Sequence, residues 1–433
     1  MSRDAEIVPG AAGKARGQGD GRYRVLMVAP TSFFADYGCH VRILEEARIL
    51  QKLGLSVKLV TYYKGRDLPG LDIERTRPTP WRANYEVGSS RHKIAFDVLL
   101  GWKGVQVARQ YRPHLIHGHL HEGALIGSAL GRLTGVPVVF DFQGSLTGEM
   151  VDHHFLRKES PFYRLWRGLE TSIDRLPAAI VTSSNHATAL LQREFGVKAA
   201  RLRTLPDCVN VDVFRPHEPG DEAAIAALKV AWGIPLERTV VAYLGLLAEY
   251  QGTHHLLQAA RRILGMRQDV HFLIMGYPGV DYFRDQANAL GLGDHVTFTG
   301  RIPYEEAPAA LRLGDIAVAP KLSATEGSGK LLTYMACGMP TVAFDAPVNR
   351  EYLGDYGMYA RSGDPDALAA ALLQFVDAPE HGRELGQRLR ARVKARFSWD
   401  ETGARLLSVY AELIGVPAGM LAPRAEELGQ HAP

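Results

Sequence analysis

The stretch YRVLMVAPTSFFADYGCHVRILEEARILQKLGLSVKLVTYY, residues 23 to 63, decides the fold. It begins with a short apolar run, 23–30, which is rich in β-branched residues and predicts a buried parallel strand. Residues 38–54 carry apolar residues at helical spacing and end on a glycine, which predicts an amphipathic helix. Residues 55–63 predict the next strand. Strand, loop, helix and strand in this order form the unit of a doubly wound α/β domain.

The same alternation continues along the chain and starts afresh near residue 238. Further strands are expected at 114–120, 136–142, 178–184, 239–244, 270–279, 295–302, 316–322 and 340–345. The fold class is therefore α/β, with two tandem Rossmann-like, doubly wound domains that face each other across a cleft. Ligands of open α/β sheets bind at the carboxyl ends of the strands, where helix N-termini attract phosphates.

The expected domain boundaries follow from this pattern. They are a disordered tail at 1–22, an N-terminal Rossmann-like domain at 23–207, a linker at 208–221, a C-terminal Rossmann-like domain at 222–398, a helix at 399–416 that packs back towards the N-terminal domain, and a tail at 417–433. The linker is rich in proline and turn-forming residues.

Composition excludes several classes of protein. A formal charge of +3 over 433 residues does not indicate a nucleic-acid partner. Three widely spaced cysteines, Cys39, Cys208 and Cys337, form neither a metal pattern nor a disulfide framework, which favours a reducing cytoplasm. No apolar run reaches the ~18 to 20 residues of a membrane span, and residues 1–22 have no signal-peptide core.

The C-terminal half carries a series of motifs: YLGLLAEYQG at 243–252, ATEGSGKLLTYMACGMPTVAFD at 324–345 and RFSWDETGARLL at 396–407. In this order they resemble the retaining, sugar-nucleotide-dependent GT-B glycosyltransferases with a KLxEYMAxGxP block, and the resemblance extends over residues 23–415. It implies transfer of a sugar from an activated nucleotide-diphosphate donor to a hydroxyl of a saccharide, a lipid-linked acceptor or a secondary metabolite. It also implies retention of configuration, no metal and no cofactor.

The resemblance implies where the donor binds. Glu326 would contact the donor sugar, and Thr333 stands where the family has the glutamate that holds the ribose. Residues 327–329, Gly-Ser-Gly, form a loop whose N–H groups suit an anion. The expected donor-binding residues are Gly38, Gly245, Arg301, Gly327, Ser328, Gly329, Lys330 and Thr333, and the expected catalytic residues are His119 and Glu326.

Two further positions depart from the family pattern. Leu246 and Gln251 stand where an arginine and a lysine usually grip the diphosphate. Arg301, Lys321 and Lys330 are candidate substitutes, or else solvated surface cations. The departures leave three readings open: an enzyme with an unusual donor, a GT-B-like protein that binds a ligand or partner without turnover, and a sugar-nucleotide epimerase.

The N-terminal half supplies the expected acceptor side. The resemblance places His119, at a strand end, near the transferred sugar, and His117 is interpreted as a core histidine. His117, His119 and His121 share one strand face, but no further ligand is placed beside them, so we expect no metal. Asp141 lies at the end of the next strand, and Gln143 and Glu149 follow it; the three are expected to contact the acceptor, or to cap a loop locally. Gly38 contacts phosphate or acceptor, or simply starts its helix.

Residues 153–177 interleave five basic residues with four aromatic ones. Such a helix can lie on an anionic membrane surface, which would make the protein peripheral at the inner membrane face. The alternative is a helix that packs its aromatic side chains inward and leaves its charges in water.

Overall fold

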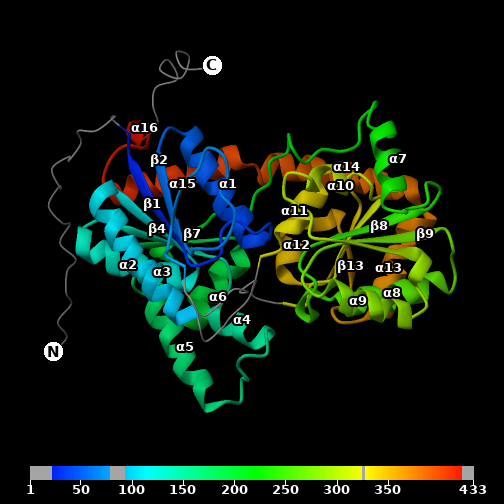
Figure 1. The fold of residues 1–433 in the computed structure, drawn as a ribbon, viewed down its shortest axis with the longest axis horizontal. Coiled ribbons are helices and arrows are strands. Elements are labelled where there is room, and N and C mark those ends of the chain that lie inside the picture. The colour runs from blue at the N-terminus through cyan, green and yellow to red at the C-terminus, as the bar shows by residue number, and fades with distance from the viewer. Residues whose placement is uncertain (1–21, 79–92, 324–326, 422–433) are drawn as a thin grey trace.

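The computed structural model describes residues 22–78, 93–323 and 327–421, and within them the chain forms two parallel-sheet domains side by side (Figure 1). The first sheet has the order β3-β2-β1-β4-β5-β6-β7 and the second the order β10-β9-β8-β11-β12-β13, with every neighbouring pair parallel. This confirms the predicted α/β class with two Rossmann-like, doubly wound domains.

The first sheet occupies the N-terminal half. Its strands are β1 (Arg24–Ala29), β2 (Ser56–Thr61), β3 (Asp72–Arg75), β4 (Leu115–His119), β5 (Val138–Phe142), β6 (Ala179–Thr182) and β7 (Leu202–Thr204). The connecting helices are α1 (Gly38–Lys52), α2 (Lys93–Tyr111), α3 (Leu120–Thr134), α4 (Leu146–Asp152), α5 (Pro161–Asp174) and α6 (Asn185–Phe195), with the 3-10 turn η1 (Ala199–Arg201).

The second sheet repeats the plan. Its strands are β8 (Thr239–Leu244), β9 (Val270–Met275), β10 (Val296–Gly300), β11 (Ile316–Ala319), β12 (Thr341–Phe344) and β13 (Met358–Ala360). Its helices are α7 (Glu222–Ala231), α8 (Thr253–Leu264), α9 (Val280–Ala289), α10 (Ala307–Leu311), α11 (Gly329–Ala336), α12 (Pro347–Leu353), α13 (Pro365–Asp377) and α14 (Pro379–Arg396), with the turns η2 (Glu249–Gln251), η3 (Gly293–His295) and η4 (Gly354–Tyr356).

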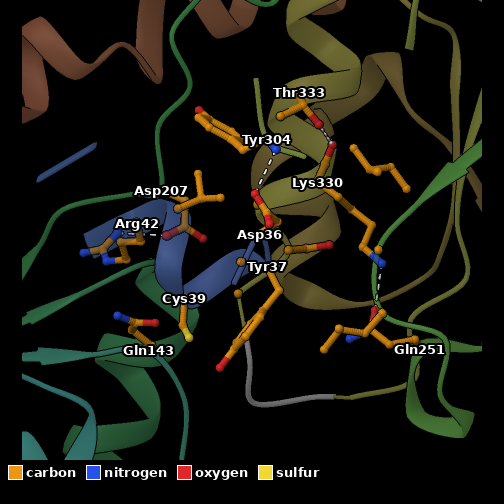
Figure 2. A pocket seen from close by; sticks show the side chains of 18 of the residues that line it. Asp36, Tyr37, Cys39, Arg42, Gln143, Asp207, Gln251, Tyr304, Lys330 and Thr333 are labelled. Carbon is orange, nitrogen blue, oxygen red and sulfur yellow. Dashed lines mark hydrogen bonds and ion pairs between the residues drawn. The ribbon is translucent and has the colours of Figure 1, made fainter. Parts of the chain in front are cut away.

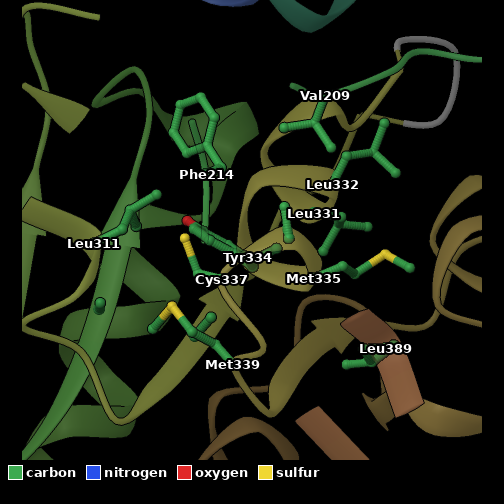
Figure 3. Packing of buried hydrophobic residues seen from close by; sticks show 14 of the residues in the cluster. Val209, Phe214, Leu311, Leu331, Leu332, Tyr334, Met335, Cys337, Met339 and Leu389 are labelled. Atoms are coloured by element: carbon green, nitrogen blue, oxygen red, sulfur yellow. The ribbon is translucent and has the colours of Figure 1, made fainter. Parts of the chain in front are cut away.

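Alternating side chains of each strand build a core on both faces of each sheet. In β1, Val25 and Met27 pack with α1, whereas Leu26 and Val28 pack with α2 on the opposite face. In the C-terminal domain one core is formed around α11, where Tyr334 and Met335 lie among buried apolar side chains (Figure 3).

The chain crosses between the domains twice. The first crossing follows β7, and the second joins α14 to α15 (Trp399–Ile414). The two crossings meet in a parallel β-bridge between Val209 and Ser398, and the Val209 N–H donates to the carbonyl of Phe397 at 3.2 Å. Helix α15 then packs against α1 and buries Leu406 and Tyr410 in the N-terminal core.

Helix α1 differs from the simple amphipathic helix expected from its spacing. Arg42, Glu45 and Glu46 are buried along with its apolar side chains. The reason is tertiary, because α15 covers one side of α1, and Asp141 and Asp207 lie against Arg42. Beyond α15, the short helix α16 (Ala418–Leu421) begins the segment expected as a tail, and residues 1–21 and 422–433 lie outside the described part of the chain.

Candidate functional site

A cavity of about 360 Å³ lies between the two domains. It opens at the carboxyl ends of both sheets, since it is lined by residues that follow strands by one or two positions. These include Pro30 after β1, Leu120 after β4, Gln143 after β5, Ser183 after β6, Gly245 after β8, Gly276 after β9, Ile302 after β10 and Lys321 after β11. Its size suits a small ligand, and its place is the one that open α/β sheets use for binding.

The C-terminal wall presents a positive charge at a helix N-terminus. Gly329 is the first residue of α11, and Lys330 follows it with its side chain along the cavity (Figure 2). The Lys330 ammonium donates to Oε1 of Gln251 at 2.7 Å and lies 4.5 Å from the ring centre of Tyr243. A helix N-terminus and an ammonium group side by side form a site for a phosphate.

Two glycines make room for this arrangement. A Cβ atom on Gly245 would lie 2.6 Å from the Lys330 ammonium nitrogen, and one on Gly276 would lie 1.9 Å from the Gly245 carbonyl oxygen. A side chain at either position would therefore displace Lys330 or the loop behind it.

The other residues expected at the donor differ in where their side chains lie and what they contact. Thr333 lines the cavity, but its hydroxyl donates to the Lys330 carbonyl of its own helix at 2.7 Å. Leu246 also lines the cavity and leaves an apolar surface there. Lys321 is buried in the wall and donates to the carbonyl of Gly327 at 2.7 Å. Among these candidate substitutes, Lys330 is the cation at the N-terminus of α11.

Arg301 does not line the cavity. Its guanidinium donates to Asp36 at 2.7 Å and lies 5.1 Å from the ring of Tyr277. It therefore joins the two domains, and its predicted contact with the donor remains a prediction.

The Gly-Ser-Gly loop faces a carboxylate of the N-terminal domain. A Cβ atom on Gly327 would lie 2.6 Å from Oδ2 of Asp207, and one on Gly329 would lie 3.8 Å from the same atom. Ser328 lines the cavity as well, with its hydroxyl buried. Glu326, which was expected to contact the donor sugar, lies outside the described residues.

Asp36 fastens the loop after β1 to the C-terminal domain. Its carboxylate accepts hydrogen bonds from Arg66 at 2.7 Å, from Arg301 at 2.7 Å and from the N–H of Tyr304 at 2.9 Å. Burial opposes the charged form, but these hydrogen bonds lower the pKa of Asp36 below its ordinary value. We call Asp36, Arg66, Arg301 and Tyr304 the Asp36 clasp, because they hold one side of the cavity closed.

Arg42 is the centre of a buried network on the N-terminal wall. Its guanidinium donates to Asp141 at 2.9 Å and to Asp207 at 2.8 Å, and it pairs with Glu46 at 3.1 Å. Although burial raises it, the charge of Arg42 holds the pKa of Asp141 well below its usual range. Burial and the neighbouring charge of Asp141 raise the pKa of Glu46 well above its usual value. The network orients α1 and the end of β5 at the cavity wall.

His119 lies behind the wall instead of on it. Its side chain is fully buried, and its Nδ1 lies 3.0 Å from Oδ2 of Asp141. Gln143 lines the cavity and donates to the same carboxylate oxygen at 2.6 Å. His119 and Asp141 therefore reach the cavity through Gln143, and their predicted direct roles remain predictions.

The remaining N-terminal candidates occupy the expected wall. Glu149 and Gly38 line the cavity, and open space lies where a Cβ of Gly38 would be. His117 is a core residue, with its Nδ1 2.5 Å from the hydroxyl of Tyr410, and burial lowers its pKa well below the ordinary value.

Glu46, His117, His119 and Asp141 could together hold a metal ion, since one ligand atom from each lies within 4.8 Å of the others. Arg42 already supplies positive charge to both carboxylates of this group. A cation placed between them would stand beside the guanidinium, which opposes binding. The expectation of a metal-free protein therefore stays as a prediction.

Helix α4, which carries Glu149, is held by α5. Glu170 of α5 accepts hydrogen bonds from the N–H groups of Leu146 at 2.9 Å and Thr147 at 3.0 Å, which begin α4. His121 lies 3.4 Å from Asp174 of the same helix. Burial opposes the charged imidazole, but Asp174 and Glu170 raise the pKa of His121 to about 9.

The residues of the cavity wall that the sequence interpretation missed include Asp36, Arg42, Asp207 and Tyr304. Arg42 had a local signal, because it stands between the apolar residues Val41 and Ile43 of the predicted helix. Asp207 and Asp36 had none, since each acts through a partner far away in the chain.

Sequence comparisons cover both domains. Residues 37–208 match the family described as glycosyl transferase 4-like domain, and residues 225–392 match the family described as glycosyl transferases group 1. The chain is 26% identical to a D-inositol 3-phosphate glycosyltransferase of Streptosporangium roseum over 86% of this chain and 88% of that protein. It is 25% identical to a 2-deoxystreptamine N-acetyl-D-glucosaminyltransferase of Streptomyces fradiae over 90% and 94%.

Among solved structures, the sucrose-phosphate synthase from Thermosynechococcus elongatus superposes with a TM-score of 0.76 at 19% identity, over 91% of this chain and all of that chain. That likeness concerns the fold. With one glycosyltransferase family match in each domain and a cleft between two parallel sheets, the chain belongs to the glycosyltransferases of the GT-B fold, and its C-terminal domain is of the group 1 type.

Proposed function

We propose that this glycosyltransferase moves a sugar from a nucleoside diphosphate donor to a hydroxyl acceptor, with retention of configuration and without a metal ion. The observation that carries the donor class is the position of Lys330. Its ammonium group stands at the N-terminus of α11, in the cavity, against the glycine loop after β8. A diphosphate is the part of a sugar nucleotide that this pairing of charge and helix terminus suits.

The proposed reaction is attack of the acceptor hydroxyl on the same face from which the nucleoside diphosphate leaves. The leaving phosphate takes the proton of the acceptor, so no carboxylate nucleophile is needed. The protein then has to stabilise negative charge that grows on the leaving phosphate. The N-terminus of α11 and the Lys330 ammonium would do so in the place of the usual arginine and lysine.

The acceptor would enter along the N-terminal wall. Gln143 and Glu149 offer an amide and a carboxylate to hydroxyl groups there. The two relatives described above are named for inositol phosphate and 2-deoxystreptamine as acceptors. We therefore take a small polyhydroxylated ring as the first acceptor class to test, and a reducing cytoplasm as the place of the reaction.

A second candidate is a binding protein that has lost turnover. Leu246 offers the diphosphate no charge, and the Thr333 hydroxyl is already engaged with its own helix. Such a protein would bind a nucleotide without transferring a sugar.

Titration calorimetry with UDP, GDP, ADP and TDP, each against its monophosphate, tests the donor site. We expect one diphosphate to bind more tightly than its monophosphate, because the second phosphate reaches Lys330 and α11. The matching sugar nucleotides are then incubated with inositol phosphates and aminocyclitols, and product is followed by mass spectrometry. Binding without any transfer supports the second candidate. Absence of diphosphate binding at about 1 mM, the upper end of ordinary KM values, contradicts both.

A further inference from the structure

Large apolar side chains are exposed along one side of the N-terminal domain. Helix α2 carries Ile94, Val98 and Trp102, which are 66%, 68% and 69% exposed. Their spacing of four residues places them in one stripe on the surface of the helix. A stripe of this kind on a helix that packs its other side in the core is unusual for a surface that only meets water.

The neighbouring helices continue the stripe into a face. Helix α3 packs against both α2 and α5, so the three lie side by side (Figure 1). Leu125 and Leu133 are exposed on α3, and α5 exposes Phe162, Leu165 and Leu169. We call Ile94, Val98, Trp102, Leu125, Leu133, Phe162, Leu165 and Leu169 the apolar face.

On these helices the exposed charged side chains are basic, whereas the acidic side chains are buried or paired. Among the exposed residues of α2, α3 and α5 as the structure describes them, the charged ones are the arginines Arg109, Arg132 and Arg164. The carboxylates of the same helices are turned inward or paired. Asp97 accepts a hydrogen bond from the Tyr62 hydroxyl, Glu170 and Asp174 are buried, and Glu122 is bonded to Lys93. The outer surface of the three helices thus combines apolar side chains with positive charge.

The apolar face borders the cavity. Lys93, the first residue of α2, lines the cavity, and Ile94 is its direct neighbour. At the other side His153 lines the cavity, and Phe155, two residues later, is 57% exposed. Whatever covers the apolar face therefore lies next to the opening of the cavity.

We propose that the apolar face rests on the surface of an anionic lipid bilayer, with the N-terminal side of the cavity opening at the level of the headgroups. Apolar side chains of a helix that lies in the interface leave water for the acyl boundary, and arginines beside them meet anionic headgroups. Among the described helices, none has the length and apolar character to cross a membrane, so the contact is peripheral. The inward packing of aromatic residues expected as the alternative for 153–177 fails for Phe155 and Phe162.

The lipid contact stands independently of glycosyl transfer. If the proposed function holds as well, the position of the cavity favours an acceptor that is itself held in the bilayer, because such an acceptor can reach Gln143 and Glu149 without leaving the headgroup layer.

The test is flotation of the full chain with two kinds of vesicle, phosphatidylcholine alone and phosphatidylcholine mixed with phosphatidylglycerol. We expect the protein to float with the mixed vesicles, and the bound fraction to fall as salt rises. The double variant Val98→Glu with Leu165→Glu should lower the bound fraction at least about tenfold, since each change removes an apolar contact and adds repulsion. The matched control is Val230→Glu with Met266→Glu, two side chains equally exposed on the C-terminal domain.

Several results would overturn the proposal. Failure of the wild-type chain to float with the mixed vesicles is one, and equal flotation of the face variant and the control is another. Light scattering of the same samples addresses a second copy as the occupant. A dimer that the face variant alone makes monomeric, together with no flotation, assigns the face to that dimer instead. Nucleotide titration of each variant separates this proposal from the function, because flotation without nucleotide binding removes the function and keeps the lipid contact.

Discussion

The ammonium nitrogen of Lys330 lies 2.7 Å from Oε1 of Gln251. Gln251 ends the turn η2 after β8, and Lys330 lies in the first turn of α11. The family resemblance described above implies a lysine at position 251. The glutamine therefore acts as an acceptor that holds the cation of another segment. In the proposed donor site the positive charge therefore lies in the first turn of α11, and the turn η2 after β8 supplies the acceptor that holds it.

Replacing Lys330 by glutamine should weaken binding of the preferred nucleoside diphosphate by about tenfold or more, because a hydrogen bond to a charged group contributes about 1.5 to 3 kcal/mol. Titration calorimetry measures the loss. Lys394→Gln, on the exposed side of α14, serves as the control. An unchanged affinity in Lys330→Gln would show that the diphosphate lies elsewhere.

Restoring the family lysine alone should not help. Gln251→Lys places a second ammonium group against that of Lys330, so we expect weaker binding or none. The double variant Gln251→Lys with Lys330→Gln moves the charge back and should recover most of the affinity. Tighter binding by the single variant Gln251→Lys would contradict Lys330 as the cation of the proposed diphosphate site.

Asp36→Asn should loosen the cavity in the absence of nucleotide. The substitution removes the charge that accepts from Arg301 of the other domain, and with it about 1 to 3 kcal/mol of contact between the domains. Because the pKa of Asp36 is lowered in the folded protein, this contribution is present above its ordinary pKa of 3.8 and is lost as the pH falls through the folded value. Small-angle scattering should show a larger radius of gyration for the variant, whereas Asp281→Asn, an exposed change, should leave it unaltered.

Replacing Arg42 by methionine should cost about 3 to 5 kcal/mol of unfolding free energy, because it leaves Asp141 and Glu46 buried without their cation. Urea unfolding measures the difference. Arg48→Met, on the same helix but half exposed and paired with Glu45, is the matched control and should cost less than about 1 kcal/mol. Equal losses for the two variants would remove Arg42 from the centre of the network.

The pH dependence of stability should contain a contribution from His121. Its pKa is about 9 when folded, against an ordinary value of 6.5, so its stabilisation is complete below pH 6.5 and disappears as the pH rises through 9. We expect His121→Gln to be less stable than wild type by up to about 3 kcal/mol at pH 6 and by much less at pH 10. Urea unfolding across this range tests it, and a gap that does not narrow with pH would contradict the raised pKa.

The sequence was most informative about the central strands. The runs around β1, β4, β5, β8 and β9 are buried on both faces, so their continuous apolar character predicts them as strands. The short outer strands β3, β7 and β13 were not predicted, because three or four residues beside one neighbour carry little pattern of their own.

Part of the site was also legible in the sequence. The glycine loops and Lys330 line the cavity as expected, since their motifs are local. The Asp36 clasp and the Arg42 network could not be predicted from the sequence, because Asp36 meets Arg301 and Arg42 meets Asp207 only after both domains have folded and docked. Buried charge of this kind depends on tertiary partners, which helical spacing does not report.

The bridge between Val209 and Ser398 has a mechanical consequence. The two crossing segments are hydrogen-bonded side by side and together form a hinge. The domains can therefore rotate about the line through these segments far more easily than they can slide or twist. Opening and closing of the cavity would then be a rotation of the two domains about an axis on the side where the segments meet. Two probes, one on each domain, placed across the cavity at the edge opposite the bridge would report nearly all of this rotation. Two probes placed beside the bridge would keep almost the same distance.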